Sequence, residues 1–519
     1  MICIPIVATN LDDAVNDMTE ASRFADIIEL RLDYMKRPDL KSLLGRRTKP
    51  VIVTNRPIRE GGKFEGNEDD RLSLLKLAIQ LHADFVDVEH DSIQRLRDDA
   101  ALITPASKTR LIVSYHHFQE TPGNITEIYQ KLSKSGADII KIVTSATTIV
   151  DNITIYRLLQ QAKMPLISFC MGEYGTISRI LYKIFGSYVT FASLQKGKES
   201  APGQVNIHDL LNVYRVKSQD KQTAIYGLIG NPVSHSIGPY IHNALFKEVG
   251  LNAVYVPFKV DRVADFIKEF KALDTRGYSV TIPHKESVIG CLDAIDPMAK
   301  KIGAVNTVIN KDGRLMGYNT DGEAAMKTLE CAIEGTSHVP SQSQTTTTNN
   351  ALLKGKTVDI LGAGGAARAI AFGLKHRGAM VTILNRNYER AQMLARDVGC
   401  LAGKPDDFQP LQTDIIINAT PVGMFPAVDD TPIARNKLKP GMVVFDTIYN
   451  PLETRLLKEA REQGCTVVGG LPMFARQAAE QFKLWTGQTP SLESIERITC
   501  ERLMNTPSQK DKNLLTKKS

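Results

Sequence analysis

Short apolar runs alternate with longer amphipathic stretches along roughly the first two hundred residues of the chain. The runs are rich in β-branched residues and predict strands at 2–8, 26–32, 50–56, 84–89, 110–116, 138–143, 165–170 and 188–192. The stretches between them, such as 71–83 and 124–137, predict helices, and Gly136 favours a helix end. About eight strands alternating with helices over about 210 residues are typical of an α/β fold of the (β/α)8 barrel type. A doubly wound open sheet is the alternative, because periodicity alone does not show closure.

Polar residues gather where these predicted strands end. Glu29 and Arg31 end the second strand, Arg56 ends the third, His116 ends the fifth, and Lys141 lies near the end of the sixth. In a barrel, reactive groups collect on the face formed by the carboxyl ends of the strands. Each residue alone is explained as a solvated strand-end charge, but together they indicate an active site.

Lys141 stands inside the apolar run ADIIKIV, residues 137–143. An unpaired ammonium group in an apolar wall is costly, because burial removes its hydration. Either this strand face meets water, or the lysine is kept partly neutral for chemistry.

The pattern changes in the second half of the chain. Residues 214–223, YRVKSQDKQT, are polar and predict a linker, after which a second α/β region begins. Residues 335–350 are low in complexity and poor in apolar residues, which predicts a flexible surface insertion. Residues 506–519 form a basic end that we expect to be disordered.

The segment 356–378 has the form of a dinucleotide-binding loop. Its glycines, with the two alanines among them, follow a predicted strand directly and open a predicted helix, so that backbone N–H groups can approach a pyrophosphate. A second predicted strand follows at 379–386, and this order makes the motif specific. The loop residues are Gly362, Ala363, Gly364, Gly365 and Ala366.

The end of that second strand favours NADP over NAD. NAD sites usually carry Asp or Glu there to hold the ribose 2′-hydroxyl, whereas this chain has Asn385 and Arg386, with Arg390 nearby. A guanidinium group pairs with a 2′-phosphate that a carboxylate would repel. The alternative is that Arg386 is an ordinary loop charge.

Composition narrows the class of protein. A chain of 519 residues predicts two to four domains, and 43% hydrophobic with 23% charged residues is typical of soluble globular proteins. The net charge of +7 is mild, no apolar run is long enough to span a bilayer, and no aromatic-interleaved basic stripe suggests nucleic-acid binding. Seven scattered cysteines predict free thiols, with neither a disulfide framework nor a metal site. The N-terminus has no basic leader, so we expect a cytoplasmic protein.

Two families of the shikimate pathway are similar to the two halves. Residues 1–212 resemble type I 3-dehydroquinate dehydratases in ELR (29–31), TNRPIREGG (54–62), SYHHF (114–118), DIIKIV (138–143), SRILYKIFGS (178–187) and SAPGQ (200–204). Residues 224–505 resemble shikimate dehydrogenases in GNPVSHSIGPYIHN (230–243), SVTIPHKE (279–286), GAVNTV (303–308), GYNTDG (317–322), GAGGAARA (362–369), NATPVGM (418–424), YNP (449–451) and GLPMFARQAAEQF (470–482). The chain as a whole resembles the fused bifunctional enzymes best known from plants.

The resemblance implies a domain plan. A dehydratase barrel would occupy 1–213, followed by the linker at 214–223. A substrate domain would be split between 224–325 and 474–505, with a Rossmann NADP-binding domain inserted at 326–473. It also implies small-molecule substrates and a monomer or homodimer.

For the first half, the resemblance assigns Lys141 as the Schiff-base lysine, with an apolar wall and neighbouring cations lowering its pKa. His116 would be the general base and Glu60 the carboxylate that orients it. His117 is a rival, but adjacent strand residues point to opposite sides, so only one can face the site. The substrate-binding residues would be Glu29, Arg31, Arg56, Arg179, which clamps a carboxylate, and the loop residues Ser200 and Gln204.

For the second half, the resemblance assigns Lys285 and Asp321 as the acid–base pair of an NADPH-dependent ketone reduction. Thr420 would lie on the cofactor side. The family often has threonine where this chain has Asn387, which leaves the margin of the NADP preference open. The substrate-binding residues would be Ser234, Ser236, Thr281, Asn306, Tyr449 and Gln477.

Two other functions fit the sequence. The second half could be an NAD-dependent quinate dehydrogenase, or the whole chain could be a non-catalytic sensor or repressor derived from such enzymes. Retention of Lys141, His116, Lys285 and Asp321 favours catalysis over the second alternative.

Overall fold

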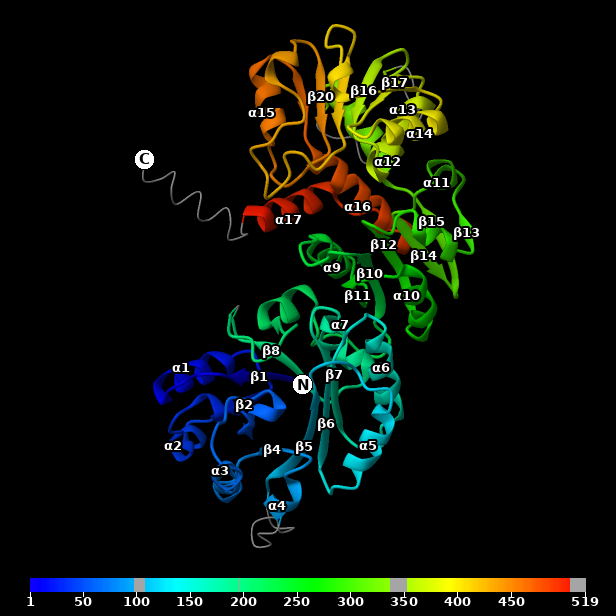
Figure 1. The fold of residues 1–519 in the computed structure, drawn as a ribbon. Helices are drawn as coiled ribbons and strands as arrows, with labels where there is room; N and C mark the ends of the chain where they lie inside the picture. Colours follow the sequence, from blue (N-terminus) through cyan, green and yellow to red (C-terminus); the bar gives the residue numbers. More distant parts are fainter. Residues whose placement is uncertain (98–107, 196, 337–351, 505–519) are drawn as a thin grey trace, which may run out of the picture. The chain divides into compact units, whose positions relative to one another are not determined.

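The computed structural model describes residues 1–97, 108–195, 197–336 and 352–504 (Figure 1). The chain divides into two compact units. The first holds Met1–Ser234 and Phe246–Thr275, and the second holds His235–Leu245 and the chain from Arg276 onward. The predicted insertion at 335–350 falls almost wholly outside the described residues, and the tail at 506–519 lies entirely outside them.

The first unit contains a curled, barrel-like parallel sheet, which confirms the predicted fold class. Its strand order is β7-β6-β5-β4-β3-β2-β1-β8-β9. The seam between β7 and β8 is closed by a 2.8 Å hydrogen bond from the Tyr188 backbone N–H to the Leu166 carbonyl, and by packing of Phe169 on Phe191. The strands are β1 (Ile2–Ile6), β2 (Ile27–Arg31), β3 (Val51–Thr54), β4 (Phe85–Glu89), β5 (Arg110–His117), β6 (Ile139–Ser145), β7 (Leu166–Met171), β8 (Thr190–Ser193) and β9 (Val205–Asn206).

Helices follow most of these strands, and local capping explains their ends. Asn10 and Asn67 accept hydrogen bonds from the first turns of α1 and α3, so the helix predicted at 71–83 begins earlier, at Glu68. Gly136 adopts φ +72° after α5, as a helix-ending glycine does. The helices are α1 (Leu11–Ala21), α2 (Leu40–Gly45), α3 (Glu68–Gln80), α4 (Ile93–Arg97), α5 (Ile125–Ser133), α6 (Asp151–Gln161), α7 (Thr176–Ile180) and α8 (Tyr182–Phe185), with short turns η1 (Leu32–Tyr34), η2 (Ile58–Glu60) and η3 (Asp209–Val213).

The predicted linker at 214–223 packs against the rest of the first unit. Val216 is fully buried, and Gln219 and Thr223 are nearly so. The linker leads into β10 (Ala224–Gly230), which pairs in parallel with β11 (Ala253–Lys259), and α10 (Val263–Glu269) with the turn η4 (Phe270–Ala272) completes this part. Helix α9 (Gly238–Glu248) connects β10 to β11.

The second unit begins with a sheet in the order β12-β14-β15-β13. Helix α16 packs on it, because Gln481 and Trp485 donate hydrogen bonds to the carbonyls of Asn306 and Val308. Its elements are β12 (Thr275–Val280), η5 (Ser287–Cys291), β13 (Ala294–Ile295), α11 (Pro297–Ile302), β14 (Thr307–Lys311), β15 (Arg314–Tyr318), α12 (Asp321–Ile333), α16 (Gly470–Thr486) and α17 (Leu492–Met504).

A Rossmann-like parallel sheet in the order β18-β17-β16-β19-β20-β21 forms the rest of the second unit. Ile360, Ile383, Ile417 and Phe445, one from each central strand, are buried in its core. Its elements are β16 (Thr357–Leu361), α13 (Gly365–His376), β17 (Met380–Leu384), α14 (Tyr388–Val398), β18 (Leu401–Gly403), η6 (Pro405–Asp407), β19 (Ile415–Asn418), η7 (Arg435–Lys437), β20 (Val443–Asp446), α15 (Arg455–Glu462) and β21 (Thr466–Val468).

The cysteines, potential metal ligands and longest helices were compared with the sequence expectations. All seven cysteines are free thiols. Within the described ranges, no cluster of three potential metal ligands is present, and no helix is long and apolar enough to cross a membrane. The exact domain boundaries stay predictions.

Candidate active sites

All nine residues predicted for the first half line one cavity at the carboxyl ends of the barrel strands. Aromatic and apolar side chains form the rest of its wall, including Phe118, Phe169, Met171 and Phe191. The shared cavity places cations, carboxylates and a histidine around a single small volume. The nine residues are Glu29, Arg31, Arg56, Glu60, His116, Lys141, Arg179, Ser200 and Gln204.

Lys141 points into the polar interior of the barrel and is 5% exposed. Its Nζ lies 2.8 Å from an Asp87 oxygen and 3.6 Å from a Glu29 oxygen, and 4.7 Å from the centre of the Phe191 ring. The lysine therefore has ionic partners, and its immediate contacts include two carboxylates in addition to the apolar wall and cations that we expected. Asp87 was not predicted, although the alternation in DFVDVE (84–89) puts it on the same strand face as Phe85 and Glu89.

Arg56 connects the lysine to a larger buried charge network. Its guanidinium group contacts Asp87 at 2.8 Å, Glu89 at 2.6 Å and the Ser114 hydroxyl at 2.7 Å. Burial favours protonation of Asp87, but Arg56 and Lys141 outweigh burial and hold the pKa of that carboxyl well below its usual range. Protein partners thus hold Arg56 in place, and through Asp87 it fixes the position of the Lys141 amine.

His116 and Glu60 form a second, half-buried pair in the cavity. Glu60 lies at the end of η2, and its Oε2 is 2.9 Å from His116 Nδ1 and accepts the His116 backbone N–H at 3.0 Å. Burial, Arg56 and Lys141 lower the pKa of His116 well below its ordinary value, and burial raises the pKa of Glu60 to about 7. His117 accepts the backbone N–H of Glu120 through its Nδ1, and His116 is the histidine in the cavity lining.

We expect dehydratase activity to fall as the pH drops through about 7. Ionised Glu60 accepts the Nδ1 proton of His116 and leaves Nε2 free as a base, whereas protonated Glu60 donates to Nδ1 and puts the proton on Nε2. The measurement is kcat/KM from pH 5.5 to 8.5 for the wild type and Glu60→Ala. The variant should be less active and lose the step near pH 7, while an unchanged step would show that another group titrates.

Arg179 is an unpaired cation in the same cavity. Its side chain is 1% exposed, it lies over the Phe169 ring at 4.2 Å, and none of its three side-chain nitrogens has a hydrogen-bond partner among the described residues. Burial lowers its pKa to about 10. A buried guanidinium group without an acceptor is unfavourable unless an anion joins it. On the facing loop, the Ser200 N–H donates to Gln204 Oε1 at 2.8 Å.

In the second unit, Lys285 and Asp321 form an ion pair with an Nζ–Oδ2 distance of 2.5 Å. Asp321 is the first residue of α12, and its other oxygen accepts a hydrogen bond from Asn306 at 2.8 Å. The Lys285 stem lies against the glycine loop, because a Cβ on Gly365 would be 3.5 Å from Lys285 Cδ. The pair is therefore fixed beside the predicted cofactor loop.

The other residues predicted to bind the substrate of the second half make separate contacts. Asn306 also donates to Thr320, Tyr449 stacks on Phe474 at 4.2 Å between ring centres, and Ser236 accepts the Gly238 N–H. Thr281 and Gln477 are half-buried, with Gln477 on α16. Ser234 is exposed in the first unit, so it is described apart from this group.

The glycine loop fits a dinucleotide phosphate. Gly362 has φ +110°, and a Cβ there would lie 2.9 Å from the Ala419 carbonyl and 3.1 Å from Thr420 Cγ2, so only glycine fits. Gly364 caps α13 with open space beside it, Ala363 precedes it, and Gly365 and Ala366 begin the helix. Thr420 therefore lies beside the loop, and its role on the cofactor side stays a prediction.

The guanidinium groups of the two arginines after β17 are available to pair with a phosphate. Arg386 and Arg390 are exposed, and no ion pair or hydrogen bond occupies either side chain in the part of the chain that the structure describes. Asn385 donates to the carbonyl of Asn387, and Asn387 caps α14 by accepting the Arg390 N–H at 3.1 Å. Asn387, the departure from the family pattern, therefore has a structural role at this position.

A buried carboxylate that sequence reasoning missed supports the Thr420 loop. Asp446 accepts hydrogen bonds from Asn418 at 3.1 Å and Thr454 at 2.7 Å, and Asn418 in turn accepts the Thr420 hydroxyl at 2.7 Å. Burial raises the pKa of Asp446 to about 6. The position of Asp446 at the end of a Rossmann strand was the available signal.

The comparisons with known proteins agree with this division. A family model described as Type I 3-dehydroquinase matches residues 2–221. Models described as the shikimate dehydrogenase substrate binding domain, as Shikimate / quinate 5-dehydrogenase, and as the Shikimate 5′-dehydrogenase C-terminal domain match 228–308, 344–437 and 470–498.

Similar proteins cover the chain in whole and in part. The bifunctional 3-dehydroquinate dehydratase/shikimate dehydrogenase, chloroplastic, of Arabidopsis thaliana is 41% identical over 505 residues, which are 94% of this chain and 82% of that protein. The shikimate dehydrogenase (NADP(+)) of Bacillus cereus (strain B4264) is 40% identical over 288 residues, 54% of this chain and 98% of that one. A crystal structure of a shikimate dehydrogenase with NADP+ has a TM-score of 0.50 and 41% identity, and covers 55% of this chain and 97% of its own.

The barrel cavity and the glycine loop define an α/β enzyme with a lyase half and an NADP-dependent oxidoreductase half. The chain belongs to the family of bifunctional 3-dehydroquinate dehydratase/shikimate dehydrogenases.

Proposed function

We propose that the chain dehydrates 3-dehydroquinate to 3-dehydroshikimate and then reduces this ketone to shikimate with NADPH. The observation that carries the proposal is the barrel cavity, where a buried amine, a half-buried histidine–carboxylate pair and an unpaired buried guanidinium face one volume. These groups match the ketone, the acidic C–H and the carboxylate of a keto acid. The similar bifunctional relative supports the pairing of the two activities.

The first step is covalent. The Lys141 ammonium group first passes a proton to water. The amine then adds to the ketone and water leaves, which forms an imine whose protonated form withdraws electrons from the adjacent carbon. His116 removes a proton from that carbon and later returns it to the departing hydroxyl as water. Hydrolysis then frees the lysine. Arg179 pairs with the substrate carboxylate, and Asp87 holds the amine in position.

The second step needs a hydride and a proton. NADPH, when bound at the glycine loop, supplies the hydride. Lys285, paired with Asp321, donates a hydrogen bond to the substrate ketone oxygen, stabilises the negative charge that develops there and then transfers its proton to that oxygen. Asn306 holds Asp321 in place through its other oxygen. Arg386 and Arg390 would pair with the 2′-phosphate of the cofactor.

The direct test is an assay of the full chain with 3-dehydroquinate and NADPH. We expect both loss of NADPH absorbance and formation of shikimate, identified by mass spectrometry. Preferential oxidation of quinate with NAD would instead support a quinate dehydrogenase, and binding of 3-dehydroquinate without turnover would support a sensor.

The NADP preference should depend on the exposed arginines. We expect Arg386→Gln together with Arg390→Gln to raise the KM for NADPH by at least about 10-fold, since one hydrogen bond to a charged group contributes about 1.5–3 kcal/mol. The KM for NADH should change little, and Asn387→Thr serves as a matched variant that keeps both charges. An equal rise in KM for both cofactors would contradict the proposed role.

We further propose that the enzyme works on small-molecule substrates as a monomer or homodimer. The cytoplasmic location inferred from the sequence stays a prediction.

A further inference from the structure

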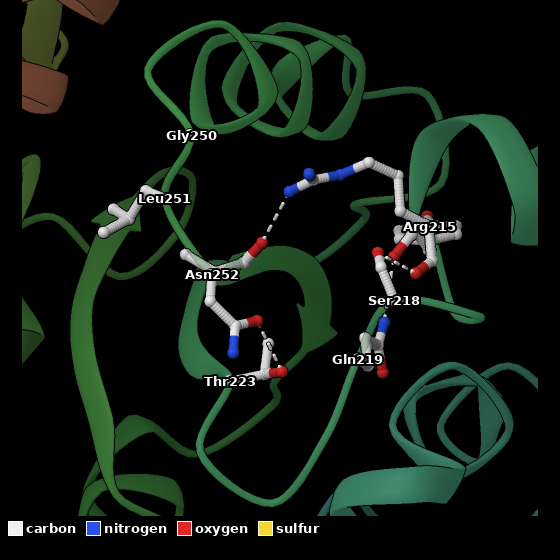
Figure 2. Close-up of a pocket in the computed structure, with 9 residues that line it drawn as sticks. Arg215, Ser218, Gln219, Thr223, Gly250, Leu251 and Asn252 are labelled. Atoms are coloured by element: carbon white, nitrogen blue, oxygen red, sulfur yellow. Dashed lines mark hydrogen bonds between the residues drawn. The ribbon is translucent and has the colours of Figure 1, made fainter.

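A second cavity lies in the first unit, where the linker meets the segment before β11. Its volume is about 200 Å³. None of the residues assigned above to catalysis or substrate binding contributes to its wall. Figure 2 shows the cavity, which is lined by Tyr214, Arg215, Ser218, Gln219, Thr223, Gly250, Leu251, Asn252 and Ala253.

Arg215 is the charged residue of this wall. Its guanidinium group extends from the linker toward Asn252 (Figure 2) and donates one hydrogen bond, to the Ala253 carbonyl at 3.0 Å. Within the described ranges no carboxylate pairs with it, and its Nε is buried without an acceptor. Burial lowers the pKa of Arg215. A half-buried guanidinium group with spare donors favours an anion as its missing partner.

The backbone of Arg215 supports this interpretation. Its φ of +48° lies in the left-handed region, which a side chain with a Cβ rarely adopts. The conformation is held by the linker turn, in which the Ser218 N–H and hydroxyl both donate to the Arg215 carbonyl. An observed backbone outlier of this kind, beside a cavity, is a reason to look for function.

Gln219 lies in the same wall, but its amide group is not available to a ligand. Gln219 is 5% exposed, and its amide nitrogen donates to the Tyr214 carbonyl at 2.9 Å. The amide oxygen has no hydrogen-bond donor among the described residues, and it is buried, so a ligand in the cavity does not reach it.

The remaining polar groups are already engaged. Thr223 donates to Asn252 Oδ1 at 2.8 Å, and Asn252 donates to Asp220. The volume of about 200 Å³ suits a small ligand. The ligand must therefore be recognised chiefly by one positive charge.

We propose that this cavity binds a small monocarboxylate. The carboxylate pairs with Arg215, whose planar donors match two carboxylate oxygens. A single guanidinium group balances one negative charge, so a monocarboxylate fits better than a phosphate dianion.

Calorimetric titration of the full chain tests the proposal. The probes are glycolate and glycine, with acetate, inorganic phosphate and the neutral glycolamide as comparisons. We expect glycolate and glycine to bind at least about tenfold more tightly than glycolamide, because a charge-assisted pair is lost in the amide. Binding of phosphate in preference to glycolate, or no binding by any carboxylate up to 50 mM, would overturn the proposal.

Variants locate the binding. Arg215→Gln should abolish glycolate binding, and Ser218→Glu should do the same by supplying an internal carboxylate, while Ser218→Gln should retain it. Arg179→Gln tests whether glycolate binds in the barrel instead. Both enzyme activities should persist in Arg215→Gln, which also shows that the variant is folded. Loss of binding in Arg179→Gln, or its persistence in Arg215→Gln and Ser218→Glu, would contradict the assignment.

Discussion

Replacing Lys141 by alanine is expected to lower the dehydratase kcat by about 10⁴-fold or more, the order of effect seen when a covalent nucleophile is removed. Without the amine no imine forms, so the carbon next to the ketone loses its electron sink and His116 has no acidic proton to remove. The measurement is the rate of increase in ultraviolet absorbance as the enone product forms.

Two controls separate chemistry from folding. The dehydrogenase activity of the same Lys141→Ala sample should be unchanged, because Lys285 and Asp321 lie in the other unit. In the Lys141→Ala variant, Asp87 still has its 2.8 Å ion pair with Arg56, so this buried carboxylate is not left without a cation. Lys141→Arg is the matched variant, since it keeps a cation beside Asp87 but does not form an imine. Normal dehydration by either variant would rule out covalent catalysis by Lys141.

Replacing Lys285 by alanine is expected to lower the dehydrogenase kcat by about 10³-fold, within the range that positioned acid–base groups contribute. The substrate oxygen then loses its cation, and Asp321 is left with the Asn306 hydrogen bond alone among the contacts described for its side chain. Turnover should be followed by NADPH absorbance with 3-dehydroshikimate at saturating cofactor.

Asp321→Asn is the matched change for this pair. Its amide oxygen can still accept from Asn306 while the charge facing Lys285 is removed, so the local structure is kept. We expect a smaller loss of kcat, about 10²-fold. The dehydratase activity reports on folding in both variants. An unchanged kcat with a raised KM would assign Lys285 to substrate binding alone.

Local patterns predicted much of the fold. All eight predicted barrel strands form, because each carries its own β-branched apolar run. The Rossmann loop could also be predicted from local sequence, because its strand, glycines and helix all lie within residues 356–386. The barrel seam could not be predicted, since the hydrogen bond from Tyr188 to Leu166 joins segments whose pairing no local pattern records.

Long-range partners explain what the sequence left out. Asp87 and Asp446 are buried carboxylates whose partners, Lys141 and Asn418, are 54 and 28 residues away along the chain. The linker was predicted from its polar composition alone, yet Val216 is fully buried and Gln219 is 5% exposed. The nine predicted barrel residues line one cavity. They meet there because the carboxyl ends of the strands, and the segments that follow them, lie on one face of the barrel, which is a property of the whole fold.

The central claim is that Lys141 bonds covalently to a keto acid, and borohydride trapping tests it most directly. The full chain is incubated with 3-dehydroquinate, reduced with sodium borohydride, digested and mapped by mass spectrometry. The account predicts one stable adduct, on the peptide that contains Lys141, with loss of dehydratase but not dehydrogenase activity. An adduct on another lysine, or complete turnover with no adduct at all, would contradict it.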